Sequence, residues 1–169
     1  MSPQSRAAWR LLPALALLLA ACGGGGASTP AGTSTTVPQP IAGDIERTEF
    51  APALNVHLDQ MVKRASGLYV QDLTMGTGGF ASRGKTAVLR YTGWRADGKQ
   101  FDDGEITMTL GKGQTIAAWE EGVLGMRVGG KRRLVVPPNL GYGARGFGDD
   151  IPPNAVLVFD ITLQSVYDK

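Results

Sequence analysis

Cysteine and histidine are almost missing from this sequence, which has one of each among its 169 residues. One cysteine excludes an internal disulfide framework, and the two residues together are too few for a metal site built from several cysteine and histidine ligands. Catalysis by a Cys–His or Ser–His arrangement would have to use His57, which lies outside the densest motifs, and we expect it to be a surface residue. The sequence therefore predicts neither a metal nor a cofactor.

An excess of charge of either sign is also lacking. The formal net charge is only +2, from 17 basic and 15 acidic residues, which is too small for the basic surface of a nucleic-acid-binding protein. Hydrophobic residues make up 43% of the chain and charged residues 19%, a balance that fits neither a disordered chain nor a polytopic membrane protein. We expect one folded domain with accessory segments and no nucleic-acid partner.

Residues 1–21 have the composition of a secretory signal. Arg6 and Arg10 precede an apolar run that ends at residue 21 and is shorter than the about 20 apolar residues of a membrane-spanning helix. The run closes with a Leu-Ala-Ala-Cys motif at Cys22, which resembles the lipobox of bacterial lipoproteins. The alternative is an ordinary signal peptide followed by a chance cysteine. We expect residues 1–21 to be a lipoprotein signal peptide and Cys22 to carry the lipid, as in that family.

Residues 22–43 are predicted to be the lipidated cysteine and a flexible tether, because they are rich in Gly, Ser, Thr and Pro and carry no charge. Loss of Arg6 and Arg10 with the signal peptide would balance the acidic and basic residues, so lipid rather than charge would hold the protein to its membrane. We expect a location in the cell envelope, facing outside the cytoplasm. Gly23 gives no signal for retention at the inner membrane, which favours the periplasmic side of the outer membrane.

Hydrophobic periodicity divides the remainder into a short extension, residues 44–65, and a domain, residues 66–169. Apolar residues at spacings of three and four predict a short helix over 53–65. In the domain, a second helix is expected over 115–122, and strands are expected over 68–74, 86–94, 106–110, 131–136 and 155–166. This order predicts an α+β fold, with the helix across one face of an antiparallel sheet.

Several motifs do not support the chemistry that they suggest. Residues 141–146 satisfy G-x-G-x-x-G, but prolines on both sides leave no strand–turn–helix unit for a dinucleotide. Lys131, Arg132 and Arg133 alternate along a predicted strand, which favours a solvated sheet face over a phosphate groove. Adjacent Glu120 and Glu121 do not converge as an acid–base pair would.

An ordered series of motifs from Ser66 to Val166 resembles the FKBP-type peptidyl-prolyl cis–trans isomerases. The segments that carry the resemblance are Ser66-Gly67-Leu68-Tyr69, Tyr91-Thr92-Gly93-Trp94, Asp97 to Asp102, Trp119 to Val123, Met126 to Arg132, Leu140 to Gly143, Ile151 to Asn154 and Leu157 to Asp160. The resemblance implies a twisted antiparallel β-sheet wrapped around one short α-helix. It also implies an enzyme that rotates X–Pro bonds in an apolar aromatic pocket.

The resemblance assigns the pocket residue by residue. Its catalytic residues would be Tyr91, Phe101, Asp102, Ile116, Trp119, Tyr142 and Phe159, and its substrate-binding residues would be Ile106, Thr115, Phe147 and Ile151. Trp119 would lie beneath the proline ring, the Ile116 N–H and the Tyr142 hydroxyl would bind substrate carbonyls, and Asp102 would supply a polar edge. The implied partners are proline-containing polypeptides and macrolide inhibitors.

The segment after Asp102 departs from the family pattern. Only residues 103–109 separate Asp102 from Leu110, and no basic residue occurs between Asp102 and Lys112. Ile106 stands where an aromatic residue is usual in the family. These differences predict weakened macrolide binding, and they leave open a non-catalytic proline-binding chaperone or assembly module on the same fold. The extension before the domain is too short for long dimerising helices, so we expect a monomer.

Replacing Cys22 by Ser should release the protein from membranes, because it removes the one thiol that could carry the lipid. Fractionation of cells that express the wild type and the Cys22→Ser variant measures this, with the activity of the domain as a control for folding. Retention of the processed variant in the membrane fraction would show that the lipobox interpretation is wrong.

Overall fold

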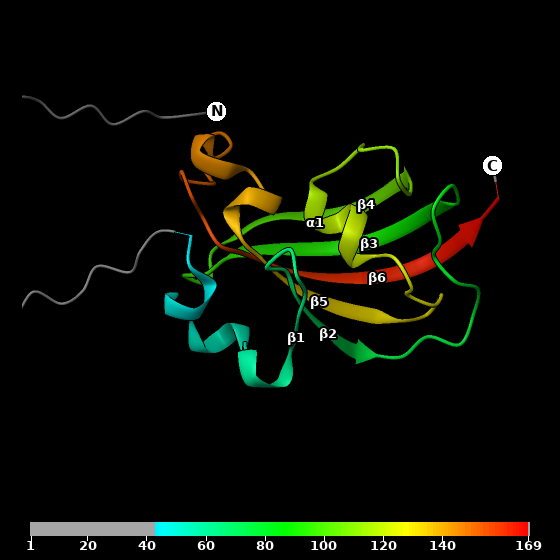
Figure 1. Ribbon diagram of the computed structural model, residues 1–169, viewed down its shortest axis with the longest axis horizontal. Helices are drawn as coiled ribbons and strands as arrows, with labels where there is room; N and C mark the ends of the chain where they lie inside the picture. The colour runs from blue at the N-terminus through cyan, green and yellow to red at the C-terminus, as the bar shows by residue number, and fades with distance from the viewer. Residues whose placement is uncertain (1–42, 169) are drawn as a thin grey trace, which may run out of the picture. The chain divides into compact units, whose positions relative to one another are not determined.

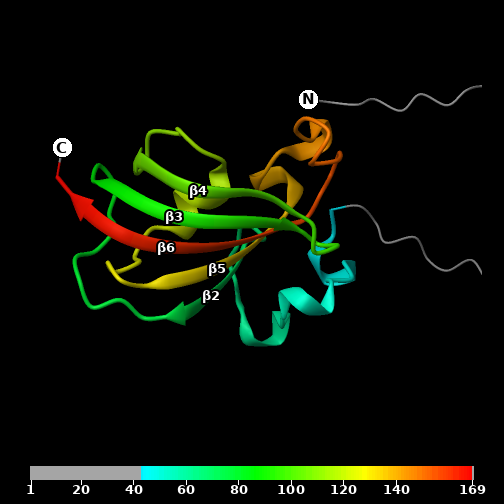
Figure 2. The same cartoon turned by 180° about the vertical axis from the view of Figure 1, so that it is seen from behind.

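The computed structural model describes residues 43–168 as a six-stranded antiparallel sheet with α1 against one face (Figures 1 and 2). The elements are β1 (Val62–Lys63), β2 (Tyr69–Thr74), β3 (Thr86–Arg95), β4 (Gln100–Thr109), α1 (Ala117–Gly122), β5 (Lys131–Val136) and β6 (Leu157–Tyr167). The strand order is β1-β2-β5-β6-β3-β4. The expected signal peptide, Cys22 and the tether up to residue 42 lie outside the described residues.

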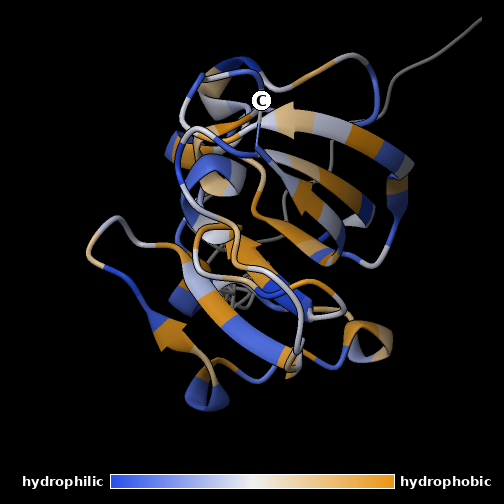
Figure 3. Ribbon diagram, turned by 90° about the vertical axis from the view of Figure 1, so that its right-hand side faces the viewer, coloured by the Kyte–Doolittle hydropathy of each residue, from blue (hydrophilic) through white to orange (hydrophobic). Residues whose placement is uncertain are grey.

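The α+β class is confirmed, and four of the five predicted strands and the internal helix lie close to their expected positions. The strand expected over 106–110 is β4, which begins six residues earlier, at Gln100. Hydrophobic residues are spread along the strands of the sheet (Figure 3). Successive side chains point to opposite faces, and continuous buried runs in β5 and β6 show that these central strands are covered on both faces. Within residues 43–168, no helix is long and apolar enough to span a bilayer.

The main core lies between α1 and the sheet. Trp119 and Val123 pack with apolar side chains of the central strands, among them Leu89, Leu134 and Ile161. Gly122 allows the close approach of the helix, because a Cβ atom at this position would lie 2.5 Å from the Leu134 side chain. The short helix is therefore held by packing rather than by its own propensity.

The helix expected over 53–65 is absent, and this prediction is wrong. The extension contains three 3₁₀ turns, η1 (Ile45–Arg47), η2 (Pro52–Leu54) and η3 (Leu58–Gln60), followed by β1. Pro52 begins η2, and Asn55 ends it in the left-handed region with φ of 49°, which breaks the backbone hydrogen-bonding pattern of an α-helix.

The apolar residues of the extension form a second hydrophobic cluster. Ile45, Leu54 and Met61 pack with Val135 and Val158. The strand neighbours of Val135 and Val158 belong to the main core, so alternation places this cluster on the sheet face opposite α1. The extension is thus part of the folded unit.

The basic run at the start of β5 is not a solvated face, so that prediction is also wrong. Arg132 is buried and forms two hydrogen bonds to Asp72, of 2.6 and 3.0 Å, while its Nη1 donates to the carbonyl of Gly122 at the end of α1. Arg133 bonds Asp160 in the same bidentate way and donates to the Leu54 carbonyl at 2.6 Å. Neighbouring arginines therefore tie α1 to one face of the sheet and the extension to the other.

Leu54→Ala should lower the free energy of unfolding by about 2–4 kcal/mol, because it leaves a cavity in the second cluster. The Leu54 side chain is only 6% exposed, whereas Val62, in β1, is 69% exposed. Val62→Ala is therefore the matched control and should change stability by no more than about 0.5 kcal/mol. Chemical denaturation of both variants measures the difference, and equal stabilities would contradict the packing of the extension.

Candidate active site

A cavity of about 340 Å³ opens between α1, the two strands β3 and β4, and the loop that follows η4 (Pro138–Leu140). Its lining is mainly apolar and aromatic, and consists of Tyr91, Asp102, Ile106, Gln114, Thr115, Ile116, Trp119, Tyr142 and Phe159. All of these except Gln114 are residues that the family resemblance assigned to the pocket. The volume suits a small ring with its flanking peptide groups.

Aromatic rings from three elements meet at Trp119, which is 5% exposed. The Trp119 ring lies edge-on to Tyr91 from β3, with centroids 4.7 Å apart, and edge-on to Phe159 from β6 at 5.4 Å. Such edge-to-face pairs stabilise the relative positions of the rings. The floor of the cavity is therefore rigid and apolar.

A β-bulge places two functional candidates side by side. The β3–β4 register passes from Gly93 opposite Asp102 to Trp94 opposite Gln100, which leaves Phe101 as the extra residue. Gly93 makes room for the aromatic rings, since a Cβ there would lie 2.7 Å from Phe159 and 2.8 Å from Phe101. Phe101 packs on Phe159 with centroids 5.6 Å apart, while Asp102 reaches the cavity.

One hydrogen bond crosses the polar edge of the cavity. The Tyr91 hydroxyl donates to Oδ2 of Asp102 at 2.8 Å. Burial, and then this bond to a carboxylate, raise the pKa of Tyr91 to about 12. The pKa of Tyr142 is also raised, by burial and then by the negative charge of Asp102. Both hydroxyl groups therefore remain protonated at neutral pH and can act as donors.

Three donors around the cavity make no hydrogen bond with any residue in the range 43–168. They are the Ile116 backbone N–H, the Tyr142 hydroxyl and the indole N–H of Trp119. Ile116 directly precedes α1 in an extended conformation, so its N–H is not used by the helix. The indole N–H is fully buried, so the cavity combines an apolar floor with two donors, the Ile116 N–H and the Tyr142 hydroxyl, that can bind the carbonyl groups of a ligand.

Three of the assigned residues lie outside the lining of this cavity. Phe101 supports Phe159 from behind, as described above. Phe147 is 65% exposed and lies next to Tyr142, with ring centroids 5.3 Å apart. Ile151 is 3% exposed and belongs to the main core; it exchanges two backbone hydrogen bonds with Phe147, of 2.8 and 3.1 Å. Phe147 and Ile151 therefore shape the loop that carries Tyr142.

Gln114 was missed by sequence reasoning. Its side-chain oxygen accepts from the Thr109 N–H at 2.7 Å and so joins the end of β4 to the segment before α1. Its position directly before Thr115 and Ile116 was the available signal. His57, as expected, is on the surface, where its ring bonds the Asn55 side chain at 3.1 Å.

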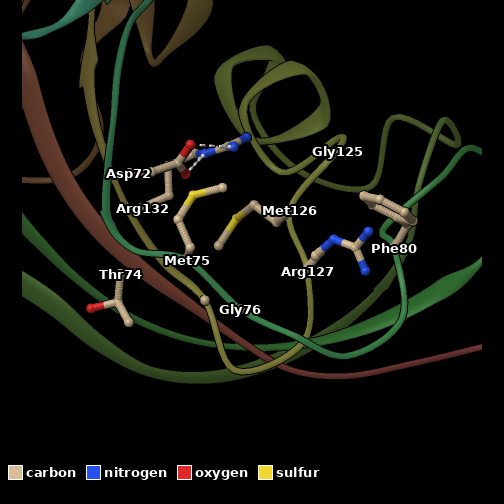
Figure 4. Close-up of a pocket in the computed structure, with 10 residues that line it drawn as sticks. Asp72, Thr74, Met75, Gly76, Phe80, Gly125, Met126, Arg127 and Arg132 are labelled. Carbon is tan, nitrogen blue, oxygen red and sulfur yellow. Dashed lines mark hydrogen bonds and ion pairs between the residues drawn. The ribbon is translucent and has the colours of Figure 1, made fainter.

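A second hollow lies beside β2, where Met75 and Met126 approach each other and Arg127 stacks on Phe80 (Figure 4). Its volume is only about 70 Å³, and the Arg132–Asp72 pair occupies one side of it. This space is far below the size of ordinary ligand sites, about 300–1,000 Å³. The aromatic cavity is the better candidate.

The fold and the aromatic cavity define a protein that binds a compact apolar ring flanked by peptide groups, and comparisons with known proteins agree. Residues 78–164 match the family described as FKBP-type peptidyl-prolyl cis-trans isomerase. The FK506-binding protein of Neisseria meningitidis serogroup B is 46% identical over 107 residues, which cover 60% of this chain and 98% of that protein.

Solved structures show the same relationship. FkpA from Escherichia coli is 35% identical with a TM-score of 0.59, covering 64% of this chain and 52% of that chain. A peptidyl-prolyl cis-trans isomerase from Pseudomonas syringae has the same identity and TM-score, and the match covers 64% of this chain and 82% of that one. The chain belongs to the FKBP-type peptidyl-prolyl cis-trans isomerase family, as its motifs predicted, and it is a prolyl isomerase.

The raised pKa of Tyr91 predicts a loss of stability at alkaline pH. The folded state keeps the Tyr91 proton up to about pH 12, whereas the unfolded chain releases it near 10. Stability from this group is therefore complete below pH 10 and is lost as the pH rises to about 12. The decline in unfolding free energy over this range should be smaller in Tyr91→Phe, as measured by denaturation at several pH values. An identical decline in both proteins would contradict the effect of partial burial and of the hydrogen bond to Asp102 on the pKa of Tyr91.

Proposed function

We propose that this cavity catalyses the rotation of X–Pro bonds in proteins outside the cytoplasm, while a lipid on Cys22 holds the enzyme to the cell envelope. The observation that carries the proposal is the rigid aromatic floor at Trp119, together with the Ile116 N–H and the Tyr142 hydroxyl at its edge, which have no partner within residues 43–168. The lipid anchor rests on the lipobox sequence. A role in folding follows from the reaction, because X–Pro isomerisation takes tens to hundreds of seconds and can limit folding.

The proposed mechanism requires no covalent bond to be made or broken. A peptide bond rotates over a barrier of about 18–20 kcal/mol, because rotation removes the resonance that keeps it planar. The planar amide is more polar than the twisted one, so an apolar cavity disfavours the ground state relative to the transition state. Each 1.4 kcal/mol of this difference is worth about tenfold in rate.

Each side chain at the cavity has a proposed part in this reaction. Trp119 lies beneath the proline ring, with Tyr91 and Phe159 as walls and Phe101 as support. The Ile116 N–H and the Tyr142 hydroxyl bind the carbonyl groups on either side of the rotating bond, because both donors have no other partner within residues 43–168. Ile106 and Thr115 complete the wall. Macrolides that present a proline-like ring would compete for the same site.

Refolding of a protein limited by proline isomerisation tests this proposal. Catalytic amounts of the enzyme should accelerate the slow phase, whereas a non-catalytic chaperone would protect only in stoichiometric amounts. Tyr142→Phe removes one hydroxyl donor and should lower kcat/KM by about threefold to tenfold, the worth of one hydrogen bond. Tyr167→Phe, at the exposed end of β6, is the matched control and should leave the rate unchanged.

A further inference from the structure

The aromatic cavity contains one charged side chain, and that charge is negative. Asp102 is the only acidic or basic residue in its lining; the others are apolar, aromatic, hydroxyl-bearing or amide side chains. Asp102 is exposed at the rim, so a ligand can reach it from solvent. The site therefore presents a net negative charge to any polypeptide that enters it.

Asp102 has no cationic partner in the part of the chain that the structure describes. Its one hydrogen bond is the 2.8 Å contact of Oδ2 with the neutral Tyr91 hydroxyl, which leaves Oδ1 without a partner there. None of the ion pairs among residues 43–168 includes it. The nearby cations of the β3–β4 turn are already paired, Arg95 with Asp97 and Lys99 with Asp150.

The negative charge of Asp102 acts on tyrosine side chains on two sides of the cavity. It raises the pKa of Tyr91 on β3 and also that of Tyr142 on the opposite loop. A positive charge brought to the rim by a ligand would therefore be attracted by a carboxylate that the protein itself leaves uncompensated. An attraction of this kind changes selectivity more than total affinity, and it weakens with added salt.

We propose that Asp102 selects prolyl segments that carry a lysine or arginine next to the proline. The cationic side chain would bind the Oδ1 atom of Asp102 at the rim while the proline ring lies on Trp119. This inference rests on the proposed function of the cavity and adds the class of substrate that it prefers.

The test compares peptides that differ in one residue, placed either directly before or directly after the proline. Lysine, norleucine and glutamate at that position supply a positive, a neutral and a negative side chain. The kcat/KM for the lysine peptide should exceed that for the norleucine peptide by about threefold at low salt, as expected for an exposed charge pair. The glutamate peptide should be the poorest, and the three values should converge at high salt.

Two variants test whether the preference for lysine peptides comes from the Asp102 carboxylate. Asp102→Asn removes the charge and keeps an acceptor for the Tyr91 hydroxyl, so the protein should fold and the ratio between lysine and norleucine peptides should fall to about one. Glu105→Gln is the matched control, because Glu105 is exposed on the same strand and alternation places it on the other face of the sheet. This variant should keep the wild-type ratio.

Equal kcat/KM values for the three peptides in the wild type, at both positions, would overturn the inference. So would a preference that persists in Asp102→Asn. Turnover of the norleucine peptide reports on the isomerase function by itself, so the two proposals fail separately. If no peptide is turned over, binding of the same peptides followed by NMR titration decides the preference, and equal affinities would overturn it.

Discussion

The contact between α1 and the sheet is the constraint on which the rest of this structure depends. Gly122 brings the helix within van der Waals distance of Leu134, and this approach places Trp119 in the main core with one ring surface lining the cavity. The same side chain therefore contributes to stability and to the floor of the site. Because protein cores tolerate little displacement, the floor of the cavity is held in one position by the packing of the core.

Two arginines connect this constraint to the remainder of the chain. Arg132 joins the end of α1 to β2, and Arg133 joins the extension to β6. Their neighbouring positions on β5 send them to opposite faces of the sheet. Since a buried guanidinium requires several acceptors, each arginine gathers a carboxylate and backbone carbonyl groups around it. The fold thus uses polar contacts on both faces of the sheet to hold two apolar clusters in place.

Sequence reasoning predicted the strands, α1 and most of the cavity lining, because alternation and the family motifs report local environments. It failed where several residues act together. Residues 53–65 have helical spacing, but Pro52 and the left-handed Asn55 break the helix, and packing on the sheet replaces it. The positions of Arg132 and Arg133 depend on acceptors from distant segments, which no local pattern shows. The bulge that leaves Phe101 packed on Phe159 and brings Asp102 to the cavity depends on strand register, which no local pattern shows either.

The two hydrophobic clusters place the packing of the extension and the cavity on opposite faces of the sheet. Residues of the extension, such as Leu54 and Met61, pack on the sheet face opposite α1, whereas the cavity opens on the α1 side. Residues 45–61 therefore do not compete with a ligand for the same surface. A segment that merely linked the domain to an anchor would need no such packing, because a flexible chain suffices for a tether. The buried contacts of residues 45–61 instead make the extension a structural part of the isomerase domain, on the face of the sheet that the cavity does not use.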